Sequence, residues 1–185
     1  NDGNIIGNGK NASNAAVTQN GGGVYLDGGT LTVSAGTISS NASTTNGGGL
    51  YIMNGTVMMG SGMLQGNVCG QSGGGVYVYN SSAVDQKTVD FNGGTLSGNS
   101  AKYGGGVCVD GLILMTIGNV EIAENTATNG GGVCLMNSAH MVFGIGQIKN
   151  NTAISQTTFS TGYQKEINEI EGFGGGVYLS TGTTL

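Results

Sequence analysis

One short phrase recurs six times along this chain of 185 residues. Each copy has three glycines, an aliphatic residue, a tyrosine or cysteine, and a second aliphatic residue. The copies begin at Gly21, Gly47, Gly73, Gly104, Gly130 and Gly174. Consecutive copies are therefore 26, 26, 31, 26 and 44 positions apart. A period of this length is typical of repeat architectures, in which each unit buries its apolar face only against its neighbours.

A second phrase follows each of the first five triple glycines with fixed internal steps. In the first copy it reads Leu31, Val33, Ile38 and Asn41, with steps of two, five and three residues. The same steps recur at Val57-Met59-Leu64-Asn67, Val89-Phe91-Leu96-Asn99, Met115-Ile117-Ile122-Asn125 and Met141-Phe143-Ile148-Asn151. Such regularity indicates that each position meets the same environment in every coil.

Apolar and polar residues alternate within these phrases, which indicates strands and not helices. We expect about three short strands per coil, at 24–27, 31–33 and 37–39 in the first coil. Equivalent strands of successive coils stack about 4.8 Å apart, the spacing of paired strands. The sequence therefore predicts an all-β fold, a parallel β-helix (β-solenoid) with about 26 residues per coil and six to seven coils.

The small and polar positions of the repeat have structural interpretations. Asparagine adopts left-handed backbone conformations at turns more readily than most residues. We therefore expect a buried ladder of side-chain amides at the corner that follows each third strand. Its members are Asn41, Asn67, Asn99, Asn125 and Asn151. Met59, Met115 and Met141 occupy apolar columns and are expected to fill the core.

The phrases GGGVYL, GGGLYI and GGGVCV, each paired with Ile/Leu-x-x-Asn, resemble the GGxI and FxxN repeats of chlamydial polymorphic outer-membrane proteins. They are also similar to β-helix repeats of large bacterial surface proteins. The resemblance covers nearly the whole chain and implies a right-handed parallel β-helix displayed outside the cell, often as an adhesin. The chain departs from that family in having Ile or Leu in place of Phe, and it has no recognisable membrane barrel.

Composition limits the partners. The chain has a net charge of −5, five lysines, no arginine and 39 glycines. Phosphate recognition favours arginine and basic clusters, so nucleic acid is not an expected partner. No apolar run is long enough to span a membrane. We expect one β-helix segment over 1–185, cut from a longer repeat array, with insertions at 9–20, 80–87 and 152–173.

The cysteines leave two alternatives open. Cys108 and Cys134 occupy the tyrosine position of adjacent coils, so their Cα atoms should lie within disulfide range. Parallel side chains in register make the bridge geometry awkward, and a pair of free thiols is the other alternative. Cys69 has no evident partner. Three cysteines and one histidine match no familiar zinc spacing, so no metal and no cofactor are expected.

Clustered carboxylates, the mark of sugar-cleaving β-helix enzymes, are not evident. Asp27 and Asp110 face outward three coils apart, roughly 14 Å, which is too far for a carboxylate pair that hydrolyses glycosides. His140 has no nucleophile at a recognisable spacing. No catalytic residue is predicted, and the chain is expected not to be an enzyme.

Tyrosines dominate one outward column. Tyr25, Tyr51, Tyr77 and Tyr178 share it, and Tyr79 lies beside it. Such a column could bind sugar rings or another partner by face contact, or it could simply stabilise the sheet by stacking. Within 152–173, residues 166–170 have a spacing compatible with one amphipathic helical turn.

These observations predict a non-enzymatic structural or adhesive segment of a large secreted or cell-surface microbial protein, which presents an extended rigid surface to a glycan or a neighbouring protein. The alternative is a fibre subunit that assembles end to end. A carbohydrate-active enzyme or a glycan-binding module is a third hypothesis. The expected localisation is extracellular or at the cell surface.

Overall fold

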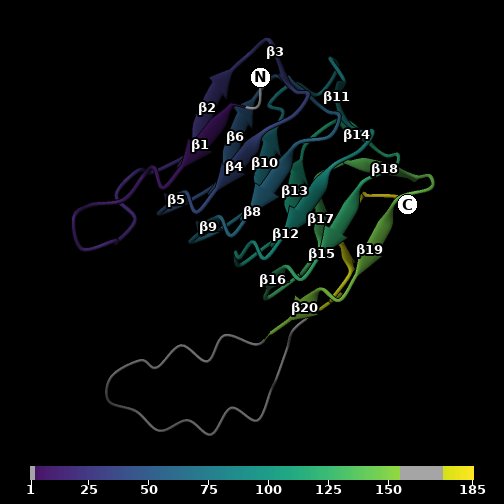
Figure 1. Ribbon diagram of the computed structural model, residues 1–185. Helices are drawn as coiled ribbons and strands as arrows, with labels where there is room; N and C mark the ends of the chain where they lie inside the picture. The colour runs from purple at the N-terminus through teal and green to yellow at the C-terminus, as the bar shows by residue number, and fades with distance from the viewer. Residues whose placement is uncertain (1–2, 155–172) are drawn as a thin grey trace, which may run out of the picture.

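The computed structural model describes residues 3–154 and 173–185, and all of their regular structure is β. Figure 1 shows the strands stacked as successive rungs of one solenoid. Every strand pairing in the three long sheets is parallel, as in Val24 to Leu50 and Leu31 to Val57. These paired residues are 26 positions apart (50 − 24 and 57 − 31). The predicted parallel β-helix with a coil of about 26 residues is therefore confirmed.

Each of the five complete coils contributes one strand to each long sheet, and the partial coils at the two ends add β1 and β21. The first sheet contains β2 (Val24–Asp27), β6 (Leu50–Met53), β10 (Val76–Tyr79), β13 (Val107–Asp110), β17 (Val133–Met136) and β21 (Val177–Leu179). The second sheet contains β3 (Thr30–Val33), β7 (Thr56–Met59), β11 (Lys87–Phe91), β14 (Ile113–Ile117) and β18 (His140–Phe143). The third sheet contains β1 (Asn4–Ile6), β4 (Thr37–Ser39), β8 (Met63–Gln65), β12 (Thr95–Ser97), β15 (Glu121–Ala123) and β19 (Gln147–Lys149).

A fourth short strand follows the asparagine in four coils, and the repeat pattern did not predict it. These strands form two separate pairs, β5 (Ala42–Ser43) with β9 (Val68–Cys69) and β16 (Thr126–Ala127) with β20 (Thr152–Ala153). Two residues are too few to show an apolar alternation, which is why the sequence gives no signal for them. No helix in the part of the chain that the structure describes is long and apolar enough to cross a membrane.

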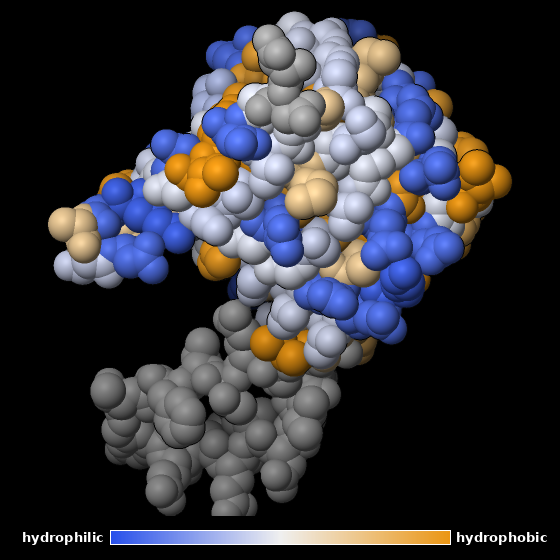
Figure 2. All heavy atoms as spheres, viewed as in Figure 1, coloured by the Kyte–Doolittle hydropathy of each residue, from blue (hydrophilic) through white to orange (hydrophobic). Residues whose placement is uncertain are grey.

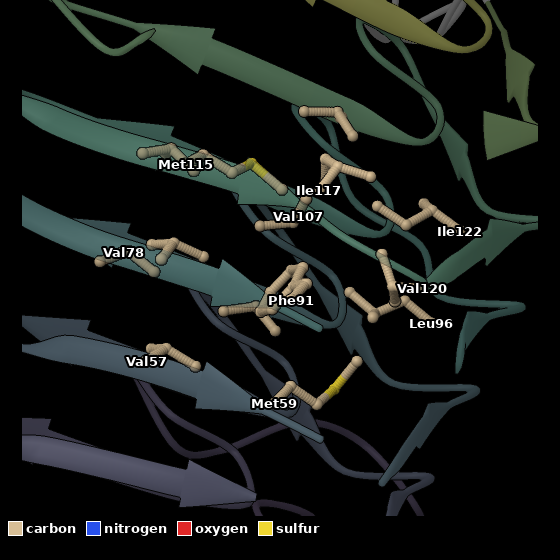
Figure 3. Close-up of a cluster of buried hydrophobic side chains, with 14 of the residues drawn as sticks. Val57, Met59, Val78, Phe91, Leu96, Val107, Met115, Ile117, Val120 and Ile122 are labelled. Atoms are coloured by element: carbon tan, nitrogen blue, oxygen red, sulfur yellow. The ribbon is translucent and has the colours of Figure 1, made fainter. Parts of the chain in front are cut away.

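The apolar columns meet inside the solenoid. Figure 3 shows side chains such as Phe91, Ile117 and Leu96 directed into one interior between the sheets. Phe91, Ile117 and Leu96 are fully buried. Met59, Met115 and Met141 also lie in this core with at most 3 % of their surface exposed. Unbranched methionine adapts to irregular gaps, which explains how it shares columns with Val and Leu.

The five predicted ladder asparagines lie directly above one another. Asn67 donates its Nδ2 to Asn99 Oδ1 at 3.0 Å and to the carbonyl oxygen of Ile38 at 2.9 Å. Its own Oδ1 accepts from the backbone N–H and Nδ2 of Asn41. Asn8 adds a further rung, because its backbone N–H and Nδ2 both donate to Asn41 Oδ1. Buried polar groups are thus paired along the whole stack.

The left-handed corner lies one residue earlier than the ladder, which corrects the reason given for the asparagines. None of the ladder residues has positive φ, whereas the residue before each one does. These preceding residues are Gly7, Ser40, Gly66, Gly98, Glu124 and Asn150, with φ between 54° and 73°. Asparagine is present at the next position because its amide satisfies the buried backbone groups of the corner.

The triple glycines pack directly against this ladder. A Cβ at Gly49 would lie 2.7 Å from the carbonyl oxygen of Gly75 and 3.1 Å from the side chain of Asn67. A Cβ at Gly48 would lie 2.5 Å from the carbonyl oxygen of Gly74. The interior copies of the phrase are buried, so the glycines admit close backbone approach and do not leave the backbone uncovered.

The insertions leave the stacking register intact. Val76 pairs with Val107, 31 positions later, and the five extra residues lie between β10 and β11. Val133 pairs with Val177, 44 positions later. The insertion predicted at 152–173 lies mostly outside the described residues, including the helical turn expected at 166–170. The insertion at 9–20 projects beside β1 in Figure 1 and closes on itself through an antiparallel bridge between Lys10 and Ala16.

Candidate functional site

The outer face of the first sheet holds the tyrosine column. Strand pairing aligns Tyr25 with Tyr51, and Tyr51 with Tyr77. The ring centroids of Tyr25 and Tyr51 are 4.9 Å apart with planes only 10° from parallel, and those of Tyr51 and Tyr77 are 5.5 Å apart. These separations fall in the range of favourable aromatic stacking. The column then continues through Cys108 and Cys134 to Tyr178.

Most of this column faces its own members and not the solvent. Tyr25 exposes 51 % of its surface, whereas Tyr51 and Tyr77 expose 8 % and 7 %. Tyr51, Tyr77, Cys108 and Cys134 form a second buried cluster, separate from the solenoid core. Met53, Tyr79, Tyr103, Met136 and Tyr178 pack against it. The column therefore does not form an exposed platform of several tyrosine rings. Tyr25 is its one member with a large exposed surface among the described residues.

One member of the column has a charged partner. Tyr77 donates its hydroxyl to Asp110 Oδ2 at 2.8 Å, and Asn137 donates its Nδ2 to Asp110 Oδ1 at 2.6 Å. Asp110 reaches Tyr77 because the two residues stand on adjacent strands, with Asp110 opposite Tyr79 in the neighbouring column. Hydrogen bonds to a carboxylate are stronger than those between neutral groups, so this contact fixes the phenol ring. The repeat pattern did not reveal this contact, because the position that Asp110 occupies one coil after Tyr77 is held by Met53 after Tyr25 and by Tyr79 after Tyr51.

Burial shapes the acid–base chemistry of the cluster. Burial, with the neighbouring charge of Asp110 and the hydrogen bond to it, raises the pKa of the Tyr77 hydroxyl. Burial, followed by the neighbouring Tyr25, raises the pKa of Tyr51. Burial, followed by the hydrogen bond with Cys134, raises the pKa of the Cys108 thiol well above its ordinary value. Each of these groups is held in its neutral form, because burial disfavours the ionised one.

The cysteines are present as free thiols. Cys108 and Cys134 pair directly on β13 and β17, and neither has any exposed surface. Cys69 lies apart on β9 and is also buried. Burial raises its pKa to about 12. A thiolate is the reactive form of cysteine, so all three thiols are placed where reactivity is low.

The carboxylates remain dispersed. The register runs from Asp27 through Met53 and Tyr79 to Asp110, so the two outward acids are three strand spacings apart, as predicted. His140 begins β18, and its Nδ1 contacts the hydroxyl of Thr184. Within residues 3–154 and 173–185, no group of three or more His, Cys, Asp or Glu side chains could hold a metal ion.

No protein-family model, curated protein or solved structure matches the chain.

Proposed function

We propose that the chain is a rigid, non-enzymatic structural segment of a secreted or cell-surface protein that presents an extended face for adhesion. The observation that carries this proposal is the asparagine ladder. From Asn8 to Asn151, every rung is tied to the next by amide hydrogen bonds of 2.8–3.1 Å. A stack joined at each rung by buried hydrogen bonds resists bending and local opening.

The surface chemistry supports contact with neutral polar partners. Figure 2 shows one face on which hydrophilic residues and residues of intermediate hydropathy predominate, and the hydrophobic residues form separate patches. The outward positions of the third sheet include Thr37, Ser39, Gln65, Thr95 and Ser97, and the same columns also carry the exposed Met63 and the Glu121–Lys149 ion pair. Hydroxyl and amide groups donate and accept hydrogen bonds without charge, which suits glycans and uncharged protein surfaces.

Adhesion is tested with the purified chain immobilised on beads. The beads are passed over a glycan array and over cultured cells, and the same chain is assayed for release of reducing ends from polygalacturonate and other polysaccharides. Retention on a glycan or cell surface without product release supports the proposal. Product release above that of buffer, or retention no greater than that of albumin-coated beads on every surface, would overturn it.

The contribution of the aromatic column is tested with Tyr25→Ala, because Tyr25 has the column's large open surface. Val17→Ala is the matched control, since Val17 is also exposed, at 59 %, and belongs to the insertion that precedes β2. Tyr51 and Tyr77 are unsuitable for this test because their removal would disturb buried packing. Loss of binding in Tyr25→Ala alone assigns the contact to the column.

End-to-end assembly is the second candidate function. The inward-column side chains of Phe143 and Leu179 lie on the outermost strands β18 and β21, where either a further coil of the same protein or a second copy of the 185-residue chain would cover them. Unpaired strand edges with apolar side chains are templates for another strand. Electron microscopy of the 185-residue chain at increasing concentration tests this candidate. Filaments of uniform width support it, and monomers at every concentration in sedimentation velocity contradict it.

A further inference from the structure

The tyrosine column is also a continuous path of oxidisable side chains from the surface into a buried cluster. Tyr25 is half exposed, and its ring stacks on Tyr51 at 4.9 Å. Tyr51 in turn lies 5.5 Å from Tyr77, which is buried. Electrons pass readily between aromatic rings in van der Waals contact, so an oxidant that meets Tyr25 is electronically connected to Tyr77.

Tyr77 differs from the other two rings in having a proton acceptor. Its hydroxyl donates to Asp110 Oδ2 at 2.8 Å, and Asn137 holds the other carboxylate oxygen at 2.6 Å. A phenol that loses one electron becomes a strong acid and must release its proton. A carboxylate already in hydrogen-bond contact receives that proton without movement of heavy atoms. Burial raises the pKa of Tyr77, so the proton is still on the phenol when the electron leaves, and the hydrogen bond to Asp110 allows the two to leave in one step.

Burial also protects the product. Tyr77 exposes 7 % of its surface, so its ring is shielded from collision with a second radical or with small reductants in solvent. Tyr25 lacks this protection because half of its surface is open. An oxidised column is therefore longest lived when the radical is on Tyr77.

We propose that Tyr77 is the site at which the column traps a one-electron oxidation, with Asp110 as the proton acceptor. One electron leaves Tyr77 through Tyr51 and Tyr25 to a one-electron oxidant in solution, which is reduced by one electron. The O–H bond of Tyr77 breaks, and its proton forms an O–H bond to Asp110 Oδ2. The products are a neutral phenoxyl radical at Tyr77 and a protonated Asp110.

The proposal is tested by flash photolysis with tris(bipyridine)ruthenium(III), generated by light in the presence of a sacrificial acceptor. Transient absorption and electron paramagnetic resonance follow the tyrosyl radical in wild type, Tyr77→Phe, Asp110→Asn and Tyr103→Phe. Tyr103 is the control because it packs against the same cluster but lies outside the stacked column. Urea unfolding and circular dichroism establish that each variant folds.

The expected result is a long-lived radical in wild type and in Tyr103→Phe, and loss of that signal in Tyr77→Phe and in Asp110→Asn. Wild-type protein in D2O supplies a measurement that needs no variant, and formation of the radical is expected to slow there because a proton moves with the electron. A long-lived signal that survives in folded Tyr77→Phe, or formation at the same rate in D2O as in H2O, overturns the proposal. Neither outcome bears on adhesion, which the bead assay measures separately.

Discussion

Asn67 donates two hydrogen bonds to a single atom of Asn99, with the backbone N–H at 2.9 Å and Nδ2 at 3.0 Å from Oδ1. Both residues are completely buried. The contact joins two coils at the corner where the chain leaves the third sheet. It repeats from rung to rung, so it ties each coil to the next along the stack.

Replacement of Asn67 by alanine is expected to destabilise the protein by about 3 kcal/mol or more, because several buried donors and acceptors lose their partners at once. The backbone N–H of Asn41 would lose its acceptor, and Asn41 Nδ2 and the carbonyl oxygen of Ile38 would each lose one hydrogen bond. Urea unfolding monitored by circular dichroism measures the change. The control is Asn46→Ala, since Asn46 is half-buried and its Oδ1 accepts from Ser72 alone at 3.1 Å. Equal losses in the two variants would contradict the structural role of the ladder.

Substitution by alanine should have different effects at the corner glycine Gly66 and at Gly48 of the closely packed triple glycine. Gly66 has φ of 61°, and a Cβ there would meet nothing within 4 Å, so Gly66→Ala incurs only the left-handed backbone penalty of about 1–2 kcal/mol. A Cβ at Gly48 would lie 2.5 Å from one carbonyl oxygen and 2.6 Å from another. Gly48→Ala is therefore expected to be much more destabilising or to prevent folding. Unfolding free energies of the two variants make the comparison, and a milder effect at Gly48 than at Gly66 would be inconsistent with the close packing of the coils.

Introducing a glycine is informative at Glu124, which has φ of 58° and occupies the left-handed corner position that Gly66 occupies in its own coil. Glycine tolerates that conformation without strain, so Glu124→Gly should leave the unfolding free energy nearly unchanged or raise it by about 1 kcal/mol at most. Glycine introduced within a strand normally lowers the unfolding free energy. Thermal and urea unfolding give the value. Thr126→Gly, two residues later in β16, is the matched control and should destabilise the protein. Destabilisation of similar size in both variants would contradict the assigned corner.

Stability should fall at alkaline pH. Cys69, Tyr77 and Cys108 are neutral when protonated, and burial raises the pKa of each in the folded state. Their contribution is fully present below the pKa values of the unfolded chain, near 8.5 for cysteine and 10 for tyrosine, and is lost as pH rises further. Above those values the unfolded state releases protons that the folded state retains, which costs about 1.4 kcal/mol per pH unit for each group.

Urea unfolding between pH 7 and pH 10.5 under reducing conditions measures this slope. Cys69→Ser removes one titrating group, whose folded pKa is raised to about 12, and should flatten the curve above pH 9. Lys10→Gln, at the insertion that precedes β2, leaves the thiols unchanged and should keep the wild-type slope. A curve that is flat to pH 10.5 in the wild type would show that the thiols and phenols are not buried as described.

The three thiols should be inaccessible in the folded protein. Cys108 and Cys134 have no exposed surface and Cys69 has 5 %. A thiol reagent such as Ellman's reagent is therefore expected to react slowly in buffer and to titrate three thiols after unfolding in guanidinium. Recovery of one thiol from the unfolded, unreduced chain would instead show that Cys108 and Cys134 are joined.

Much of the fold follows from the spacing of a few residues. The steps from Leu31 to Val33, Ile38 and Asn41 define the second sheet, the third sheet and the ladder, because three apolar residues and one asparagine recur at these steps in five coils. The left-handed corner could not be located in the same way. Its position is occupied by Ser40, Gly66 and Glu124 in different coils, so no residue type marks it.

The candidate site was predicted less completely than the fold. The tyrosine column could be placed by register, but the burial of Tyr51 and Tyr77 depends on side chains from other columns, such as Met53, Tyr79 and Tyr103. The contact between Tyr77 and Asp110 joins neighbouring columns of adjacent coils. A repeat pattern describes what is common to the coils, and this contact exists because one coil differs from the others.

The ladder is tested most directly by an experimental structure at a resolution that places side-chain amides. The account predicts Asn41, Asn67, Asn99, Asn125 and Asn151 in one line, with Asn67 Nδ2 close to 3.0 Å from Asn99 Oδ1. A map in which Asn67 and Asn99 are not on adjacent rungs, or in which their amides face solvent, would contradict it.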